Sequence, residues 1–340
     1  MRVTLEDVCE KGASNLKQSD VVSMTGEYPI YGAAGYLGNV DFYHQEKPYV
    51  AIVKDGAGIG RTTLHPAKSS VIGTMQYLLP KDNVLPEYLY YVVRHMHLEK
   101  YFTGATIPHI YFRDYKNEKF NLDSLDKQAE IVEILGKAEL IVLKRRQQLA
   151  ELDKLIKARF VELFGDPLKN DKSFSTVPGE VLFKLSNGKA LPNNKRFTVG
   201  VPAYGGNGVS WYTDEILCDY DTIIIGRVGF QSGNVHLAKA PLWVTDNAMY
   251  ISGINNKECD IRFLCSLMEH LDFKRYQDAG DLKKITQKPF MQMHYLLPPI
   301  SLQKQYIAFV EQTDKSKVAV QKALDEAQLL FDSLMQKYFQ

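Results

Sequence analysis

The chain has 340 residues, of which 45% are apolar and 24% charged, a composition typical of a globular protein with two or three domains. Its 41 Lys and Arg residues nearly balance its 40 Asp and Glu residues, and the net charge of +1 argues against a protein that holds nucleic acid by a broad positive field alone. There is no apolar run of about 18 residues and no apolar signal-peptide stretch at Met1, so we expect a cytoplasmic location. Four scattered cysteines without Cys-x-x-Cys spacing indicate reduced thiols and no zinc site.

The sequence repeats itself once, at an offset of 173 to 175 residues. Three segments recur in order, namely Pro29–Gly35 as Pro202–Gly208, Ala51–Lys54 as Ile224–Arg227, and Leu125–Gln128 as Ile300–Gln303. A period this long is too large for a solenoid. It indicates two copies of a whole domain, each followed by its own helix.

Each copy has the pattern of an α+β module. In the first copy, β-branched and aromatic residues predict strands at 48–54 and 75–79 and a helix at 86–98. In the second copy, the corresponding elements are strands at 222–226 and 248–252 and a helix near 261–271.

A long helix is predicted after each module. Apolar residues spaced alternately by four and three indicate a coiled-coil seam of roughly 48 Å at 1.5 Å per residue. The seam residues are Leu135, Val142, Leu149, Leu152, Ile156 and Leu163 in the first helix, and Val310, Val320, Leu324, Phe331, Leu334 and Tyr338 in the second. Asp126 and Ser301 are the predicted N-caps, and Gly165 followed by Pro167 should end the first helix.

The order of the chain predicts that the two helices pack antiparallel, with Gln340 near the first module. The alternative is that each helix lies separately on its own module. The predicted fold is thus α+β, with two pseudo-repeated modules joined by two long antiparallel coiled-coil helices. The predicted domains are a first module at 1–125, a spacer helix at 126–165, a second module at 166–300 and a second spacer helix at 301–340.

No catalytic constellation is evident. Gly56–Thr63 has Arg61 where a dinucleotide fingerprint needs its last glycine, and it lacks the Gly-Lys-[Ser/Thr] of a phosphate loop. The Asn-Pro-Pro-aromatic loop with which methyltransferases hold a flipped adenine is also missing. His95 and His97 diverge on a predicted helix, so they are not expected to share a metal.

Polar and aromatic residues on equivalent loops are the remaining candidates for function. They combine phosphate donors with side chains able to read base edges, although a solvated loop face could carry the same residue types. The candidate DNA-binding residues are Tyr31, Tyr36, Lys54, Arg61, Thr62 and Thr63 in the first module, and Lys195, Arg196, Tyr204, Asn207, Trp211, Arg227, Gln231 and Asn234 in the second.

The ordered duplication resembles the specificity subunit of a type I restriction–modification system. The shared features are a Pro-x-Tyr-Gly segment, a strand ending in a Gly-rich basic loop, a Gln-containing entry into each long helix, and the junction Leu163–Pro167. The resemblance implies that each module is a target recognition domain reading one half of a bipartite sequence in double-stranded DNA. It implies that the helices space the modules and dock two modification (methyltransferase) subunits, with restriction (motor and nuclease) subunits added for cleavage.

The resemblance also implies a non-catalytic chain without a cofactor or metal of its own. S-adenosylmethionine, ATP and magnesium would then belong to the partner subunits. Two alternatives stay open: a self-sufficient DNA-modifying enzyme with unrecognised motifs, and a scaffold with two protein-binding heads.

Overall fold

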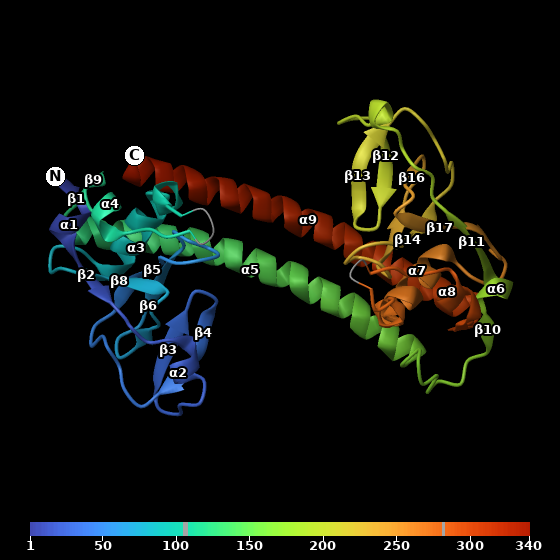
Figure 1. Ribbon diagram of the computed structural model, residues 1–340, viewed down its shortest axis with the longest axis horizontal. Helices are drawn as coiled ribbons and strands as arrows, with labels where there is room; N and C mark the ends of the chain where they lie inside the picture. The colour runs from blue at the N-terminus through green and yellow to red at the C-terminus, as the bar shows by residue number, and fades with distance from the viewer. Residues whose placement is uncertain (105–107, 281–282) are drawn as a thin grey trace. The chain divides into compact units, whose positions relative to one another are not determined.

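The computed structural model describes residues 1–104, 108–280 and 283–340, which form two compact units (Figure 1). Unit 1 comprises Met1–Gln147 and Gln321–Gln340, and unit 2 comprises Gln148–Val320. Each unit therefore contains one α+β module and a part of both long helices.

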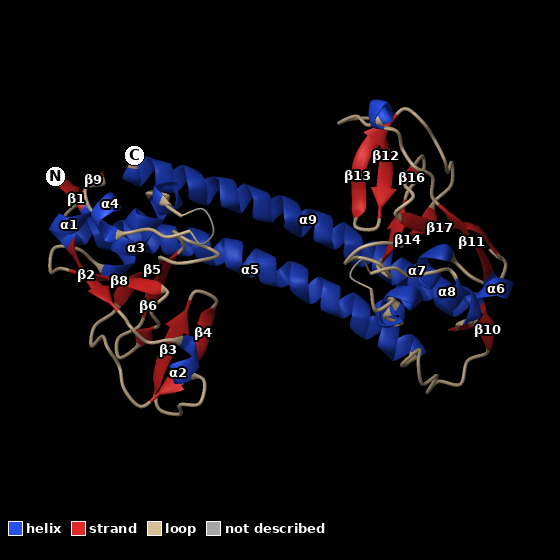
Figure 2. Cartoon of the chain, viewed as in Figure 1, coloured by secondary structure: helices blue, strands red, loops and turns tan. Residues whose placement is uncertain are grey.

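The module of unit 1 is built on a four-stranded antiparallel sheet in the order β2-β8-β5-β6, beside a three-stranded sheet in the order β4-β3-β7 (Figure 2). Helix α3 packs on strands β5, β6 and β8. The elements are β1 (Arg2–Thr4), α1 (Leu5–Val8), β2 (Cys9–Ala13), α2 (Gln18–Val21), β3 (Tyr28–Gly32), β4 (Gly35–Val40), β5 (Tyr49–Val53), β6 (Thr62–His65), β7 (Ser70–Val71), β8 (Met75–Pro80), α3 (Pro86–His95), the 3₁₀ helix η1 (Leu98–Tyr101), α4 (Phe112–Tyr115) and β9 (Lys119–Asn121), which pairs with β1.

Unit 2 repeats this architecture with sheets in the orders β11-β17-β14-β15 and β13-β12-β16. Its elements are β10 (Thr176–Pro178), α6 (Gly179–Leu182), β11 (Phe183–Asn187), the 3₁₀ helix η2 (Asn193–Lys195), β12 (Val201–Gly205), β13 (Gly208–Thr213), β14 (Thr222–Gly226), β15 (Val235–Ala238), β16 (Trp243–Val244), β17 (Ala248–Ile254), α7 (Ile261–His270), the 3₁₀ helix η3 (Phe273–Tyr276), α8 (Lys288–Gln292) and β18 (His294–Leu296), which pairs with β10. The predicted internal repeat is therefore a repeat of structure as well as sequence.

The two long helices are α5 (Leu125–Phe164) and α9 (Ile300–Phe339), of 40 residues each. In unit 1 the beginning of α5 packs against the end of α9, where Phe339 lies 5.4 Å from Tyr88 of the module, centroid to centroid. In unit 2 the beginning of α9 packs against the end of α5, and Tyr306 lies 5.6 Å from Phe160. The antiparallel pairing is thus present in both units, and the alternative of a separate helix on each module is wrong.

The predicted N-caps are each wrong by two residues. Helix α5 begins at Leu125, before Asp126, and the Ser124 hydroxyl accepts a bond from the amide of Lys127 at 3.4 Å. Ser301 lies inside α9, because the carbonyl of Pro299 already accepts from Leu302. The C-terminal prediction is confirmed: Gly165 has a φ of +72° and its amide donates to Val161.

The first predicted helix ends earlier than expected. It stops at His95 and not at 98, because His97 adopts a φ of +51° and begins a separate 3₁₀ turn. The four cysteines, all within the described residues, are buried and free of disulfides, as predicted. Within the described ranges we find neither a cluster of three potential metal ligands nor a helix able to cross a membrane.

A buried glutamine at the start of each long helix fastens that helix to its module. Gln128 is fully buried. Its side-chain oxygen accepts a hydrogen bond from the amide of Leu85 at 2.8 Å, and its side-chain nitrogen donates to the carbonyls of Asn83 and Asp123. Because Leu85 is the N-cap of α3, one side chain satisfies backbone groups at the starts of two helices.

Gln303 does the same in unit 2. It is fully buried, and its side-chain oxygen accepts a hydrogen bond at 2.9 Å from the amide of Asp260, which is the N-cap of α7. Its side-chain nitrogen donates to the carbonyls of Glu258 and Pro298. Two equivalent residues thus make three equivalent hydrogen bonds each.

We predict that Gln303→Ala lowers the free energy of unfolding of unit 2 by about 1–3 kcal/mol, because it leaves a buried amide and two carbonyls without partners. Urea unfolding followed by tryptophan fluorescence measures this, since Trp211 and Trp243 both lie in unit 2. The control is Gln305→Ala on the exposed face of the same helix turn. Equal effects of the two substitutions would refute the role of the buried amide.

Candidate nucleic-acid interface

Each module presents a two-stranded hairpin, β3–β4 in unit 1 and β12–β13 in unit 2. Both hairpins shift register at the same place, before Tyr31 and before Tyr204, and both pair in parallel with a short strand of the same sheet. The side chains on this shared backbone differ: Gly38 of β4 is replaced by Trp211 in β13. The two hairpins therefore share a backbone register but present different side chains.

Three of the predicted residues of unit 1 gather at its hairpin. The Tyr31 ring lies 6.0 Å from the exposed Tyr36, and the guanidinium of Arg61 donates to the carbonyl of Ala33 at 2.6 Å. Burial raises the pKa of Tyr31, whose ring also lies 4.4 Å from His65. This group combines two aromatic rings with one cation.

The other predicted residues of unit 1 lie apart from this group. Lys54 follows β5 and pairs with Asp55 at 2.5 Å, and the ring of His109 lies 2.7 Å from the same carboxylate. Burial alone would raise the pKa of Asp55, but hydrogen bonds from Lys54 and His109 outweigh it and lower the pKa. Thr62 and Thr63 are on β6 and line a hollow of about 460 Å³ beside α3 and α5.

In unit 2, Lys195, Arg196 and Trp211 come together beside β13. Arg196 donates twice to the carbonyl of Leu191, and its guanidinium lies 5.5 Å from the centroid of Trp211. Lys195 forms an ion pair with Asp214 at 3.2 Å, and this hydrogen bond raises its pKa. Two predicted phosphate donors are thus already engaged within the protein.

The remaining predicted residues of unit 2 lie near the loop between β14 and β15. Asn207 is exposed at the β12–β13 turn, and the adjacent Gly206 packs against Gly226. Arg227 donates weakly to the carbonyl of Asp246, while the Asn234 amide donates to the side chain of Gln231. Tyr204 is half-buried on β12.

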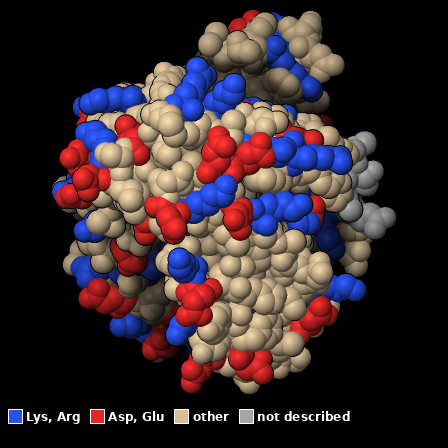
Figure 3. Space-filling view, turned by 90° about the vertical axis from the view of Figure 1, so that its left-hand side faces the viewer, with Lys and Arg blue, Asp and Glu red and all other residues tan. Residues whose placement is uncertain are grey.

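Four cations beside that loop were missed by the sequence interpretation. Lys274 and Arg275 are on η3, and Lys283 and Lys284 follow the gap in the described residues. Elsewhere the charges are mixed: on the face drawn in Figure 3, Lys and Arg lie among Asp and Glu, beside a broad uncharged area. The sequence signal that could have revealed these four residues is that they form two adjacent basic pairs, Lys274–Arg275 and Lys283–Lys284.

The predicted seam residues are buried or half-buried. Leu135 is fully buried, and Val142, Val320 and Phe331 are also buried. The half-buried seam residues are Leu149, Leu152, Ile156, Leu163, Val310, Leu324, Leu334 and Tyr338. Three aromatic side chains of the helix packing, Phe160, Phe164 and Phe339, lie outside the predicted seam.

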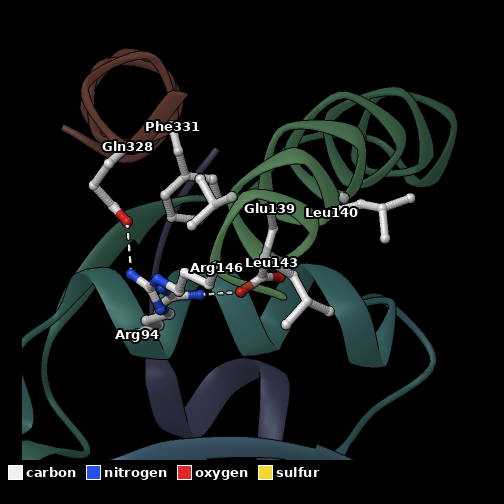
Figure 4. A pocket seen from close by; sticks show the side chains of 9 residues that line it. Arg94, Glu139, Leu140, Leu143, Arg146, Gln328 and Phe331 are labelled. Carbon is white, nitrogen blue, oxygen red and sulfur yellow. Dashed lines mark hydrogen bonds and ion pairs between the residues drawn. The ribbon is translucent and has the colours of Figure 1, made fainter. Parts of the chain in front are cut away.

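A hollow of about 370 Å³ opens between α3, α5 and α9 of unit 1 (Figure 4). Figure 4 shows the ion pair of Arg94 and Glu139 between Phe331 and Leu143. The guanidinium of Arg94 lies 4.9 Å from the Phe331 centroid, so an aromatic ring and a carboxylate both hold it.

Apolar side chains are exposed on the helices next to this hollow. Leu140, Ile141 and Leu143 of α5 are about half exposed, at 47%, 47% and 50%. Val318 of α9, which is equivalent to Leu143 by the 175-residue offset, is 71% exposed. This one equivalent position therefore presents an apolar side chain to solvent in both helices, whereas Leu140 and Ile141 correspond to Lys315 and Ser316.

The chain belongs to the type I restriction modification DNA specificity domain family, whose model matches residues 1–154 and 179–327. It is 24% identical over 201 residues to the type I restriction enzyme EcoprrI specificity subunit of Escherichia coli. That match covers 56% of this chain and only 49% of the relative, so it spans about half the length of the curated protein.

Solved structures share the fold. The S subunit of a type I restriction-modification system from M. genitalium superimposes with a TM-score of 0.69 at 18% identity, covering 100% of this chain and 96% of that one. A structure described for complex assembly and conformational transition of the type I R-M system has a TM-score of 0.50 at 13% identity, covering 99% and 97%. The predicted family and fold class are confirmed.

His65 packs against Tyr31 of the β3–β4 hairpin of unit 1. Its ring is buried, lies 4.4 Å from Tyr31 and 5.2 Å from Tyr49, and its Nε2 is 2.7 Å from the Thr63 hydroxyl. Burial lowers the pKa of His65 from 6.5 to about 4. The folded protein therefore favours the neutral ring.

We predict that unit 1 loses about 2 kcal/mol of stability between pH 7 and pH 5. Below pH 6.5 the unfolded chain binds a proton that folded His65 does not take up until about pH 4, so the folded state is disfavoured as the pH falls through this window. Hydrogen exchange of β5, corrected for its intrinsic pH dependence, measures the loss. His65→Gln should remove this loss and His97→Gln, at an exposed position, should not; a wild-type pH profile in the His65 variant would contradict the prediction.

Proposed function

We propose that this chain is the DNA sequence-recognition subunit of a type I restriction–modification complex, in which each module reads one half of a bipartite target. The observation that carries the proposal is the pair of hairpins with one backbone register and different exposed side chains. Direct readout depends on side chains that reach base edges, so different side chains on the same scaffold favour different half-site sequences.

The two long helices would space the modules and dock two modification (methyltransferase) subunits. Two features support this: each helix continues unbroken for 40 residues, and Leu143 and Val318 are exposed at equivalent positions. A pseudo-repeated surface suits two copies of one partner, because each copy would meet the same backbone geometry.

Catalysis would be carried out by the partner subunits and not by this chain. S-adenosylmethionine, ATP and magnesium would be bound by the methyltransferase and restriction subunits, and the complex would act on double-stranded DNA in the cytoplasm. The alternatives are a self-sufficient modifying enzyme and a two-headed protein scaffold. Methyl transfer by the purified chain alone would favour the first, and a reconstituted complex without sequence-specific DNA binding would favour the second.

We predict that replacing residues 1–125 by those of a relative changes one half of the recognised sequence and leaves the other half intact. The reconstituted complex selects duplexes from a random pool, and sequencing of the bound DNA gives both half-sites and the spacer. A hybrid in which both half-sites change would contradict modular readout. The control is the same exchange of residues 166–300, which should change the other half only.

We further predict that Leu140→Glu with Leu143→Glu weakens association with the modification subunit more than tenfold, because charge would enter the centre of an apolar contact. Sedimentation of the co-expressed subunits measures the association. Gln312→Glu adds a charge at an exposed position of α9, six residues and about 120° around the helix from Val318, and should have little effect. Unchanged association in the double variant would exclude this face as the docking surface.

A further inference from the structure

Phe230 is the most exposed aromatic side chain among the described residues, at 82%. It lies in the loop between β14 and β15, beside Arg227, Gln231 and Asn234. A single exposed apolar residue is common on protein surfaces and needs no explanation by itself. The geometry of the loop and the charges around Phe230, however, suit one class of ligand.

The backbone of the loop is held in place. Gly229 and Gly233 adopt φ values of +88° and +89°, and the amide of Gly233 donates to Gly226 at 2.8 Å. The amide of Gly229 donates to Lys283, and the side chain of Gln277 donates to the carbonyl of Ser232 at 2.6 Å. The ring is therefore presented by a backbone tied to two other segments, so little conformational entropy would be lost on binding.

The surroundings of the ring are cationic. The Lys274 ammonium lies 5.7 Å from the Phe230 centroid, and the loop with its packed segments 272–278 and 283–285 carries five cations against two carboxylates. The cations are Arg227, Lys274, Arg275, Lys283 and Lys284, and the carboxylates are Asp272 and Asp278. None of these cations forms an ion pair with a described residue. This combination of a fixed ring and available cations matches a polyanion with stacked aromatic faces.

The equivalent loop of unit 1 shares two left-handed glycines and a backbone hydrogen bond with this loop but has neither feature. Gly56 and Gly60 have φ values of +82° and +81°, and the amide of Gly60 donates to Val53 as Gly233 does to Gly226. Ala57 takes the position of Phe230, and Glu99 takes that of Lys274. Of the two cations of this loop, Lys54 is paired with Asp55, and the guanidinium of Arg61 donates to the carbonyl of Ala33.

We propose that Phe230 is a wedge that inserts between adjacent base pairs of the half-site bound by unit 2, with the neighbouring cations on the flanking phosphates. Apolar wedges of this kind partly unstack a base step and bend the duplex. Because Ala57 is too small for this role, unit 1 leaves its half-site stacked. The inference rests on the proposed DNA-recognition function and adds an asymmetry to it.

The test uses the reconstituted complex and a set of duplexes with 2-aminopurine at each step of both half-sites in turn. The fluorescence of 2-aminopurine rises when the base is unstacked. The target and the assignment of half-sites come from the selection and module exchange described above. Base flipping by the modification subunits also raises the fluorescence and does not depend on Phe230. We therefore expect a Phe230-dependent rise at one step of the unit 2 half-site and no Phe230-dependent rise in the other half-site. Phe230→Ala should abolish the rise and weaken DNA binding at least about fivefold, and Phe230→Leu should retain part of both.

Phe102→Ala is the matched control, since Phe102 is an exposed aromatic of unit 1. It should leave the fluorescence of the unit 2 half-site unchanged, and tryptophan fluorescence should show that the Phe230 variants stay folded. Wild-type fluorescence and affinity in Phe230→Ala would overturn the wedge, as would a loss of subunit assembly with DNA binding intact, which would make Phe230 a protein contact. Absence of sequence-specific binding by the wild-type complex would instead refute the proposed function itself.

Discussion

The hydrogen bonds of Gln128 and Gln303 determine how each long helix leaves its module. A buried amide surrounded by backbone groups has few alternative arrangements, because any other orientation leaves a donor or an acceptor unpaired in a medium of low dielectric. The first turn of each helix is thereby fixed to the start of α3 or α7. The packing of Phe339 on Tyr88, and of Phe160 on Tyr306, follows from that fixed direction.

The residues that stabilise the fold are distinct from the residues that differ between the two halves of the chain. The glycines at 56, 60, 229 and 233 keep the same left-handed conformation in both loops, whereas the side chains between them are unrelated. Exposed side chains at such positions contribute little to folding, since surface substitutions away from special contacts usually change stability by less than about 0.5 kcal/mol. The surface of one module can therefore differ from that of the other without a change of architecture.

Sequence patterns were enough to predict the repeat, the long helices and the glycine at 165, because heptad spacing and a left-handed helix end are local signals. They misplaced the N-caps, because Asp126 and Ser301 are also residue types that cap helices. The residues that do so are Ser124, through its hydroxyl, and Pro299, through its carbonyl. The pairing of Lys195 with Asp214 joins residues 19 apart, and periodicity does not show it. Phe230 was overlooked because one apolar residue in a loop has no pattern, and its neighbour Lys274 comes from a distant segment.

The near-neutral charge of the chain limits its nonspecific attraction to DNA. Lys54, Lys195 and Arg94 are moreover each held by a carboxylate within the protein. Nonspecific affinity for DNA comes mainly from the number of phosphates neutralised, whereas discrimination comes from base contacts and from the cost of deforming the duplex. In the proposed function, a recognition subunit with a net charge of only +1 binds wrong sequences weakly. A larger share of its affinity then depends on the sequence, which raises the ratio of specific to nonspecific binding.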